Sequence, residues 1–304
     1  MKLDVRLSLL LTLPPLLWAG NAVVGRLMAS SVPPLLLNAL RWALAFALLL
    51  PFAVGLIRQP AALLQRWRYF ALSGFLGMGC YNALQYQALR SSSALNVTLI
   101  AASMPVGMLA VGALAFGVMP TRRQLLGALL SLLGVALVMA HGRPEALAQV
   151  HFVAGDLLML LAVLCWAVYS WMLARPPAPM QGEARPGWAR GDWAATLMAQ
   201  MVFGLPIAGA MAGIEQLYTT QATHWGPGLA LALAYVAIGP ALIAYRCWGL
   251  GVAQAGPSLA AFFGNLTPVF AALMSAALLG EWPQWYHGGA FALIVAGISV
   301  SSRR

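Results

Sequence analysis

The sequence predicts an all-α membrane protein with ten transmembrane helices, arranged as two inverted repeats of five helices each. The first observation behind this prediction is composition, because only 8% of the 304 residues are charged while 62% are hydrophobic. Roughly a quarter of the residues are charged in a soluble domain, so a cytosolic enzyme, a disordered protein and a secreted disulfide scaffold are excluded. The second observation is a series of ten apolar runs, and the third is a pattern that the two halves of the chain share.

The apolar runs have the length of about 20 residues that an α-helix needs to cross a bilayer. The first run follows Lys2 and Arg6, and no small-residue cleavage site leads from it into a soluble domain, so we predict a transmembrane helix and not a signal peptide. Residues 175–192 hold four prolines and three arginines and predict an extended loop. The predicted spans are 7–28, 34–57, 69–89, 93–118, 123–140, 153–174, 193–213, 227–250, 257–279 and 286–302.

The basic residues predict the orientation, because loops on the cytoplasmic side carry an excess of Lys and Arg. With ten spans, twelve of the 17 basic residues fall on one side, Arg26, Arg90 and Arg143 fall on the other, and Arg41 and Arg246 fall within spans. Both termini are therefore predicted to be cytoplasmic. The twelve residues on that side are Lys2, Arg6, Arg58, Arg66, Arg68, Arg122, Arg123, Arg175, Arg185, Arg190, Arg303 and Arg304.

Neither the cysteines nor the net charge indicates a metal, a cofactor or a nucleic acid. Cys80, Cys165 and Cys247 lie in apolar runs without a CxxC pair, and no Cys/His cluster has zinc-ligand spacing, so we expect no metal and no cofactor. A net charge of +10 would suggest nucleic acid for a soluble protein. Because membrane topology accounts for the basic residues here, we expect no nucleic-acid partner, and expect membrane lipid and a small-molecule substrate instead.

The pattern shared by the two halves consists of prolines, glycines and tryptophans that recur at a constant distance. It predicts a first repeat over residues 1–142 and a second over 152–304, and five helices per repeat place the second repeat upside down in the membrane. Inverted repeats are typical of alternating-access transporters, whose substrate site lies between the halves near the middle of the membrane. An offset of 163 pairs Pro105 with Pro268, Gly117 with Gly280, Pro120 with Pro283 and Gly134 with Gly297, and an offset of 148 pairs Trp18 with Trp166.

Several short motifs, taken in order along the chain, indicate a family. They are Leu17-Trp18-Ala19-Gly20-Asn21, Leu40-Arg41-Trp42, Gly155-Asp156, Trp166-Ala167-Val168-Tyr169 and Asn265-Leu266-Thr267-Pro268-Val269. With them the whole chain resembles the ten-helix EamA-type permeases of the drug/metabolite transporter superfamily, and it is similar in particular to bacterial exporters of aromatic amino acids. The first half departs from the pattern with Val118 where the second half has Glu281, so we interpret Glu281 as a structural residue at a helix end.

The resemblance implies a transporter of the bacterial inner membrane that exports small metabolites, above all neutral or aromatic amino acids, by alternating access. Spans 1–4 and 6–9 would line or gate its central cavity, and spans 5 and 10 would brace the outside of each half. The arrangement is compatible with a monomer. Two alternatives stay open, namely a flippase for lipid-linked sugars and an exporter of another metabolite such as a nucleobase or a drug.

Arg41 is a candidate for substrate binding, since an arginine inside a bilayer is costly and needs a reason. It lies seven residues into its span, about 10 Å from the non-cytoplasmic end at 1.5 Å per residue. A guanidinium that faces a cavity would attract a carboxylate. The alternative is that Arg41 reaches the interface or tethers carbonyls of a neighbouring helix. Arg246, close to the predicted cytoplasmic end of span 227–250, is interpreted as reaching that interface.

Amides and aromatic rings complete the predicted site. An amide binds both ends of a zwitterion, although it also holds helices together, and an aromatic-lined cavity suits a flat, mostly apolar solute. Asn21 shares a helical face with Trp18, and Trp166 shares one with Tyr169. The alternative for the aromatic residues is plain packing between helices. The predicted substrate-binding residues are Trp18, Asn21, Asn38, Arg41, Tyr81, Gln85, Trp166, Tyr169 and Asn265.

Prolines and small residues are expected to shape the helices. Pro105 and Pro268 correspond in the two repeats and are predicted to be symmetric hinges, with static kinks as the alternative. Gly127 and Ser131 have the small-xxx-small spacing of closely packed helices, and Gly74 is interpreted in the same way.

The seven acidic residues carry the prediction about coupling. Neither a carboxylate nor a histidine is predicted at the middle of the membrane, since Asp156 lies at the start of a span as a helix cap and Glu215 lies in a loop. We therefore predict transport without a buried carboxylate for proton coupling. Enzymes are disfavoured, because the nearest match to the G-x-S-G loop of an intramembrane protease, Ala71-Leu72-Ser73-Gly74, lacks the first glycine and no HExxH motif is present. A channel is disfavoured by the lack of a charged ring.

Overall fold

The computed structural model describes residues 4–88, 91–92, 94–143, 145, 151–190, 193–279 and 284–302. Most of these residues are helical, and none of them lies in a β-strand. The prediction of an all-α, polytopic membrane protein is confirmed. The physical reason is that a bilayer offers the backbone no water, and a helix satisfies its hydrogen bonds within one segment.

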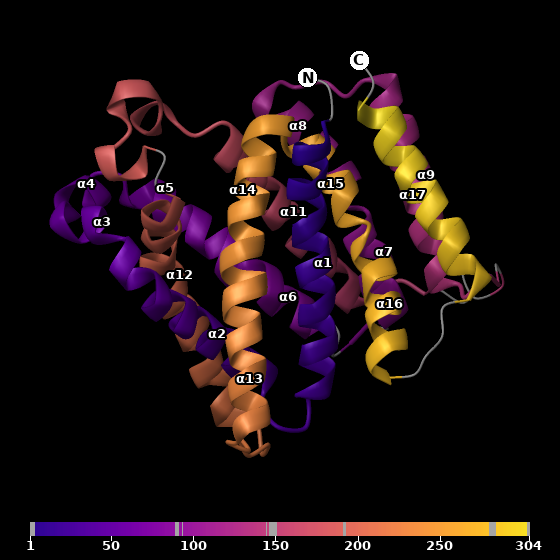
Figure 1. Ribbon diagram of the computed structural model, residues 1–304, viewed down its shortest axis with the longest axis horizontal. Helices are drawn as coiled ribbons and strands as arrows, with labels where there is room; N and C mark the ends of the chain where they lie inside the picture. The colour runs from indigo at the N-terminus through magenta and orange to yellow at the C-terminus, as the bar shows by residue number, and fades with distance from the viewer. Residues whose placement is uncertain are drawn as a thin grey trace. The chain divides into compact units, whose positions relative to one another are not determined.

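In the first half of the chain, two predicted spans are single helices and three are divided (Figure 1). The single helices are α1 (Val5–Leu27) and α9 (Arg122–Met139), whereas the second span, predicted over 34–57, divides into α2 (Pro34–Leu49) and the short segments that follow it. The third span consists of α5 (Trp67–Gly74), the π-helical segment η2 (Phe75–Cys80) and α6 (Tyr81–Ala88), and the fourth consists of α7 (Ala94–Ala102) and α8 (Met104–Phe116). Between α2 and α5 lie η1 (Leu50–Phe52), α3 (Val54–Arg58) and α4 (Pro60–Leu64).

The second half repeats the division of the third and fourth spans. Its single helices are α11 (Ala154–Ala174), α12 (Trp193–Tyr218) and α17 (Trp285–Ser302). The eighth span consists of α13 (Pro227–Val236), the π-helical segment η6 (Ala237–Ile243) and α14 (Ala244–Ala255), and the ninth consists of α15 (Pro257–Gly264) and α16 (Thr267–Leu279). The third and eighth spans thus share a π-helical segment, and the fourth and ninth spans share a break.

Seven stretches of the described residues are long and apolar enough to cross a membrane. They are Val5–Leu27, Pro34–Phe52, Arg122–Met139, Ala154–Ala174, Trp193–Tyr218, Pro227–Ala255 and Pro257–Met274. The predicted third, fourth and tenth spans are also helical over most of their length but are not among these seven. The count of ten transmembrane helices therefore stays a prediction.

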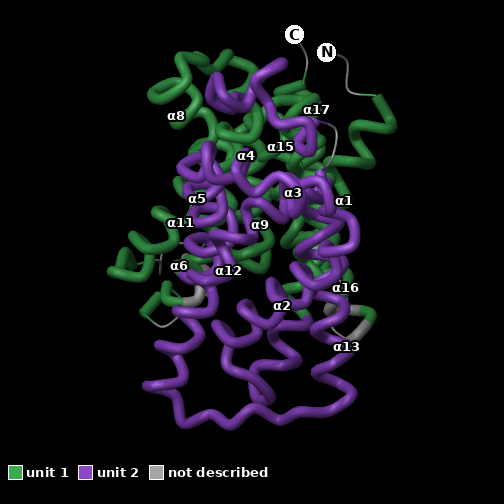
Figure 2. The backbone as a smooth tube through the Cα atoms, turned by 90° about the vertical axis from the view of Figure 1, so that its left-hand side faces the viewer, with its two compact units in different colours: residues 1–23, 84–174, 247–304 green, residues 24–83, 175–246 purple. Residues whose placement is uncertain are grey.

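The chain forms two compact units, each built from segments that are far apart in the sequence (Figure 2). The first unit holds residues 1–23, 84–174 and 247–304, and the second holds residues 24–83 and 175–246. Each unit takes residues from both halves of the chain. This division by contact differs from the predicted division into repeats at 1–142 and 152–304, which stays a prediction about the sequence.

In the first unit, α9 and α17 pack closely along their length (Figure 1). A Cβ atom on Gly127 would lie 2.7 Å from the carbonyl oxygen of Gly297, and one on Gly134 would lie 2.9 Å from that of Ala290. Under the offset of 163, Gly127 corresponds to Ala290 and Gly134 to Gly297, so each contact is the counterpart of the other. This reciprocity is the mark of a two-fold relation, and the interpretation of Gly127 as a packing residue is confirmed.

In the second unit, α12 packs against α2 and against α5 with η2. A Cβ atom on Gly74 would lie 2.4 Å from the carbonyl oxygen of Gln200, and one on Gly204 would lie 3.1 Å from that of Gly74. Two helices approach this closely only where side chains are absent. Gly74 is therefore a packing residue, as predicted.

Two predictions about polar segments of the second unit are wrong. Residues 175–192 are not an extended loop over the described part, 175–190, because three short 3₁₀ turns, η3 (Ala178–Met180), η4 (Gly182–Ala184) and η5 (Gly187–Ala189), fold it compactly. Met180 and Trp188 are buried, and Arg66 donates hydrogen bonds from Nε to the oxygen of Pro179 at 2.9 Å and from Nη2 to that of Ala184 at 2.7 Å. An arginine that satisfies backbone carbonyls lets a proline-rich segment pack without regular structure.

Glu215 is the second correction. It lies in the last turns of α12 and not in a loop. Its two carboxylate oxygens accept hydrogen bonds from the backbone nitrogens of Leu35 and Leu36, at 3.1 and 2.9 Å. Those amides belong to the first turn of α2, where N–H groups have no partner within the helix and a negative charge is favourable. Glu215 thus caps a helix that is distant in the sequence.

Candidate functional site

The breaks in the fourth and ninth spans lie at corresponding positions and touch each other. α7 ends at Ala102, and Asn265, which corresponds to Ala102 under the offset of 163, follows the end of α15. The buried amide nitrogen of Asn265 donates to the oxygen of Ala102 at 3.1 Å and to Oγ of Ser131 at 2.8 Å. Asn265 therefore ties a broken helix to its neighbours, so its amide nitrogen serves the packing role that the sequence left as an alternative.

Pro105 and Pro268 each lie in the first turn of the helix that follows a break, α8 and α16 respectively. A proline is tolerated at this place because its missing N–H would have no partner within the helix. The second helix of each span therefore begins next to its proline. A break of this kind is where half-helices can move against each other, and the role of the two prolines as hinges stays a prediction.

An aromatic cluster in the first unit joins three of the predicted site residues. Trp18 of α1 meets Trp166 of α11 edge to face, with ring centroids 5.4 Å apart, and Tyr169 lies 5.1 Å from Trp166. Trp248 of α14 completes the cluster at 5.4 Å from Trp18 and 5.6 Å from Trp166, and its Nε1 donates to Oγ of Ser170. Trp166, Tyr169 and Trp248 are buried and Trp18 is half-buried. Trp18 thus offers the accessible face of the cluster.

A polar cluster in the second unit joins two further predicted residues, Asn38 and Arg41. Both are buried on the same face of α2, and Nη2 of Arg41 donates to Oδ1 of Asn38 at 2.7 Å. The same oxygen lies 3.4 Å from Nδ2 of Asn82, which is half-buried on α6. The guanidinium carbon lies 5.1 Å from the ring centroid of Trp42, and Tyr245 of α14 meets that ring edge to face at 5.0 Å.

This cluster places a guanidinium and two amides beside two aromatic rings. Asn38 orients Arg41 by accepting a hydrogen bond from it, since an arginine presents five donors and no acceptor. A guanidinium held in this way pairs with a carboxylate through two parallel hydrogen bonds. The arrangement is suited to an anionic group attached to an apolar body.

Three other predicted residues have less defined surroundings. Asn21 is half-buried on α1, and Tyr81 and Gln85 are half-buried on α6, four residues apart and so on one face. Their roles in binding stay predictions. Two further polar residues of the predicted spans, Tyr86 and Asn96, have side chains outside the described residues. Glu281 lies outside the described residues altogether.

Trp248 and Asn82 were missed by reasoning from the sequence. The signal for Trp248 was present, because the offset of 163 pairs it with Gln85, a residue that was predicted. The signal for Asn82 was weaker, since only the structure shows that it lies beside Asn38. Arg246 was placed too close to a helix end, because α14 continues to Ala255, and its guanidinium carbon lies 4.9 Å from the ring centroid of Trp193.

Asp156 qualifies the prediction about carboxylates. The side chain is fully buried, although the prediction placed it at the start of a span and excluded only a carboxylate at the middle of the membrane. It lies in the first turn of α11, where Oδ2 accepts from the backbone nitrogen of Val153 at 2.8 Å and Oδ1 accepts from Oγ of Ser92. These contacts are those of a helix cap, as predicted, and they satisfy both oxygens of a buried polar side chain.

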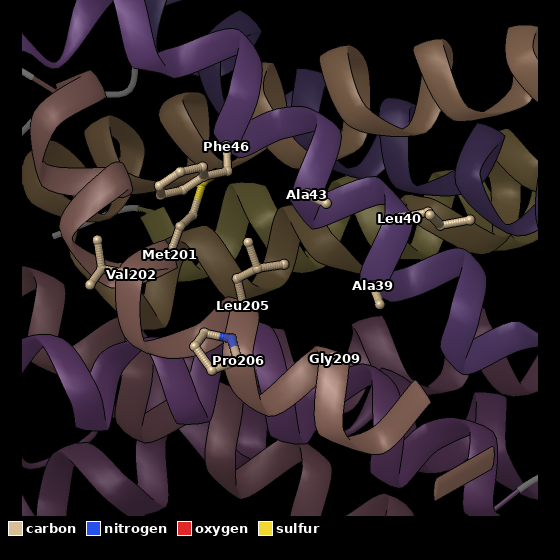
Figure 3. Close-up of a pocket in the computed structure, with 9 residues that line it drawn as sticks. All are labelled: Ala39, Leu40, Ala43, Phe46, Met201, Val202, Leu205, Pro206 and Gly209. Atoms are coloured by element: carbon tan, nitrogen blue, oxygen red, sulfur yellow. The ribbon is translucent and has the colours of Figure 1, made fainter. Parts of the chain in front are cut away.

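An apolar groove with a volume of about 460 Å³ runs between α2 and α12 (Figure 3). It is lined by Ala39, Leu40, Ala43, Phe46, Met201, Val202, Leu205, Pro206 and Gly209. The four lining residues of α2 lie on the face of that helix that is turned away from Asn38 and Arg41. A groove without polar side chains offers nothing to bind a carboxylate or an ammonium group, so we place no substrate site there.

The fold and its buried polar cluster define a polytopic helical protein of the membrane. The chain belongs to the EamA-like transporter family, whose model matches residues 6–140 and again residues 153–303. It is 24% identical to an uncharacterized transporter of Archaeoglobus fulgidus over 99% of both chains, and 24% identical to the aromatic amino acid exporter YddG of Ancylobacter novellus over 94% of this chain and 93% of that protein. A crystal structure with a TM-score of 0.74 and 23% identity covers 98% of this chain and 96% of that one, which supports the fold.

These comparisons define the class of activity. The chain is a multi-pass membrane transporter for a small-molecule substrate and not an enzyme.

Proposed function

We propose that the chain exports neutral or aromatic amino acids across the bacterial inner membrane by alternating access. The observation that carries the proposal is Arg41, a buried guanidinium that Asn38 orients beside the ring of Trp42. Burying an arginine in a membrane protein is costly, so a function for its charge is expected. A substrate with a carboxylate and an apolar side chain matches this chemistry.

The aromatic cluster supports the same substrate class. Trp18 is half-buried beside the buried Trp166 and Trp248, so it can stack on a flat apolar group without moving the rest of the cluster. The name of the Ancylobacter novellus relative, an aromatic amino acid exporter, points in the same direction. The substrate-binding set proposed here is Trp18, Asn21, Asn38, Arg41, Tyr81, Gln85, Trp166, Tyr169 and Asn265, with Pro105 and Pro268 as hinges.

The proposal includes topology and coupling. The distribution of Lys and Arg supports cytoplasmic termini, and the arrangement is compatible with a monomer. Coupling does not use a carboxylate at the middle of a span, since Asp156 and Glu215 both cap helix ends. A flippase for lipid-linked sugars and an exporter of a nucleobase or a drug are the competing functions.

Transport in proteoliposomes tests the proposal. We expect saturable uptake of radiolabelled phenylalanine that excess unlabelled phenylalanine, tryptophan or leucine blocks and that a nucleobase does not block. Failure of every amino acid to compete would refute the substrate class. Translocation of a lipid-linked sugar in the same vesicles, without phenylalanine uptake, would favour the flippase.

A further inference from the structure

The two π-helical segments of the second unit occupy corresponding places in the two halves of the chain. η2 spans Phe75–Cys80 and η6 spans Ala237–Ile243. The offset of 163 that pairs Pro105 with Pro268 carries residues 75–80 onto 238–243, which lie within η6. π-helices contain well under 1% of residues in proteins, and they occur frequently at functional sites. Two π-helical segments at corresponding positions indicate that both serve the same function.

A π-helical turn changes the backbone hydrogen bonds around it. Its N–H groups bond five residues back and not four, which bends the helix and leaves a carbonyl without its usual partner. In η6, Pro240 also removes one N–H group. The fourth and ninth spans have their breaks at corresponding positions, and the third and eighth have these weakened turns. Weakened turns are places where a transmembrane helix can bend.

A hydrogen bond connects η2 to the first turn of α14, which directly follows η6. The hydroxyl of Tyr245, two residues after the end of η6, donates to the carbonyl oxygen of Gly77 in the middle of η2 at 2.5 Å. Tyr245 is buried, and a buried phenol needs an acceptor, which here is a backbone oxygen of the π-helical turn. The same ring packs edge to face on Trp42, next to Arg41.

We propose that Tyr245 is a positioning residue of the transport cycle. Its hydroxyl latches η2 to η6 in the conformation described above, and the two segments part when this bond breaks. Because Tyr245 packs on Trp42, parting of the segments also releases the ring beside Arg41. The proposal rests on the protein being a transporter and not on the identity of its substrate.

Tyr245→Phe tests the latch, since it removes one oxygen and keeps the ring on Trp42. Cys80, the last residue of η2, is 7% exposed, so the reactivity of its thiol reports on parting of the segments. In a C165S/C247S background in proteoliposomes, we expect N-ethylmaleimide to label Cys80 about two- to tenfold faster in Tyr245→Phe, the factor that loss of one ordinary hydrogen bond gives. The maximal rate of phenylalanine transport should rise while its half-saturating concentration stays the same.

Two controls separate a latch from general loosening. Tyr218→Phe removes a hydroxyl from a residue that is 84% exposed and should leave Cys80 labelling unchanged. In a C80S/C247S background, Tyr245→Phe should leave the labelling of Cys165 unchanged. Unchanged Cys80 labelling in folded Tyr245→Phe, an equal increase at Cys165, or a fall in the maximal rate overturns the latch. Faster Cys80 labelling in a protein that does not transport phenylalanine supports the latch and contradicts only the proposed substrate.

Discussion

Trp18 and Trp166 meet edge to face, with ring centroids 5.4 Å apart and ring planes at 85°, although they occupy corresponding positions in the two halves of the chain. A residue contacts its own counterpart only where it lies close to the axis that relates the two copies. Asn265 and Ala102, which also correspond, are joined by a hydrogen bond of 3.1 Å. Within the first unit, the residues nearest to the axis of the repeat are therefore an aromatic pair and a pair of helix breaks.

Trp18→Ala is expected to weaken binding of aromatic substrates selectively. Trp18 is the half-buried member of the cluster, so its loss removes a stacking surface and leaves the buried Trp166 and Trp248 in place. An aromatic pair contributes about 0.5–1.5 kcal/mol, so the half-saturating concentration of phenylalanine should rise about two- to tenfold and that of leucine less. Competition assays in proteoliposomes measure both values.

The control for Trp18 is Trp225→Ala, because Trp225 is 69% exposed and should not affect either substrate. Trp18→Phe keeps an aromatic ring and should keep most of the affinity. An equal loss for phenylalanine and leucine in Trp18→Ala would assign Trp18 to helix packing and contradict its role in binding.

Arg41→Gln is expected to remove the attraction for a carboxylate. Hydrogen bonds to charged groups contribute about 1.5–3 kcal/mol, so the half-saturating concentration of phenylalanine should rise about ten- to a hundredfold. Inhibition by phenethylamine, which has the same ring and no carboxylate, should not change. Arg41→Lys keeps the charge without the planar fork and should give an intermediate value.

Arg246→Gln is the matched control, since Arg246 is the other arginine inside a predicted span and packs on Trp193. It should leave the affinity for phenylalanine unchanged. If Arg41→Gln weakened phenylalanine and phenethylamine alike, the guanidinium would act as a structural tether of α2, the alternative that the sequence left open.

Gly127→Ala is expected to destabilise the fold, because a Cβ atom there would lie 2.7 Å from the oxygen of Gly297. Overpacking of this kind costs about 1–3 kcal/mol. Gly213→Ala in α12 is the matched control, since no atom lies within 4 Å of its added Cβ and alanine is the better helix former by about 0.5–1 kcal/mol. The unfolding midpoints in detergent should move in opposite directions. A stable Gly127→Ala protein would contradict the close packing of α9 on α17.

The sequence predicted the membrane class, the approximate positions of most helices and the packing role of Gly127 and Gly74. It did so because apolar runs and small-residue spacings are local signals. Contacts that depend on which helices are neighbours were not predicted. Glu215 caps α2 from the distant end of α12, and the signal in the sequence is only a glutamate near an apolar run.

The same reason explains the incomplete prediction of the candidate site. Arg41 and Asn38 are three residues apart on one helix, so helical geometry alone places them together. Asn82 of the third span contacts Asn38, and Tyr245 of the eighth span packs on Trp42 next to Arg41. No local sequence pattern predicts these contacts between helices. The π-helical segments are also invisible to a period of 3.6 residues, because one extra residue in a turn leaves the apolar run unbroken.

Asp156→Asn is expected to leave transport unchanged, because the carboxylate caps α11 and does not lie at the middle of a span. Asparagine keeps one acceptor oxygen for the backbone nitrogen of Val153, and its NH2 group can donate to the hydroxyl of Ser92, which then accepts instead of donating. Phenylalanine uptake into proteoliposomes should keep its rate and should not be driven uphill by an imposed pH gradient in either protein. Glu183→Gln, which changes an exposed carboxylate, is the control. If a pH gradient drove accumulation in the native protein and not in Asp156→Asn, Asp156 would be a coupling carboxylate, because removing a cap alone does not change the energy source of transport.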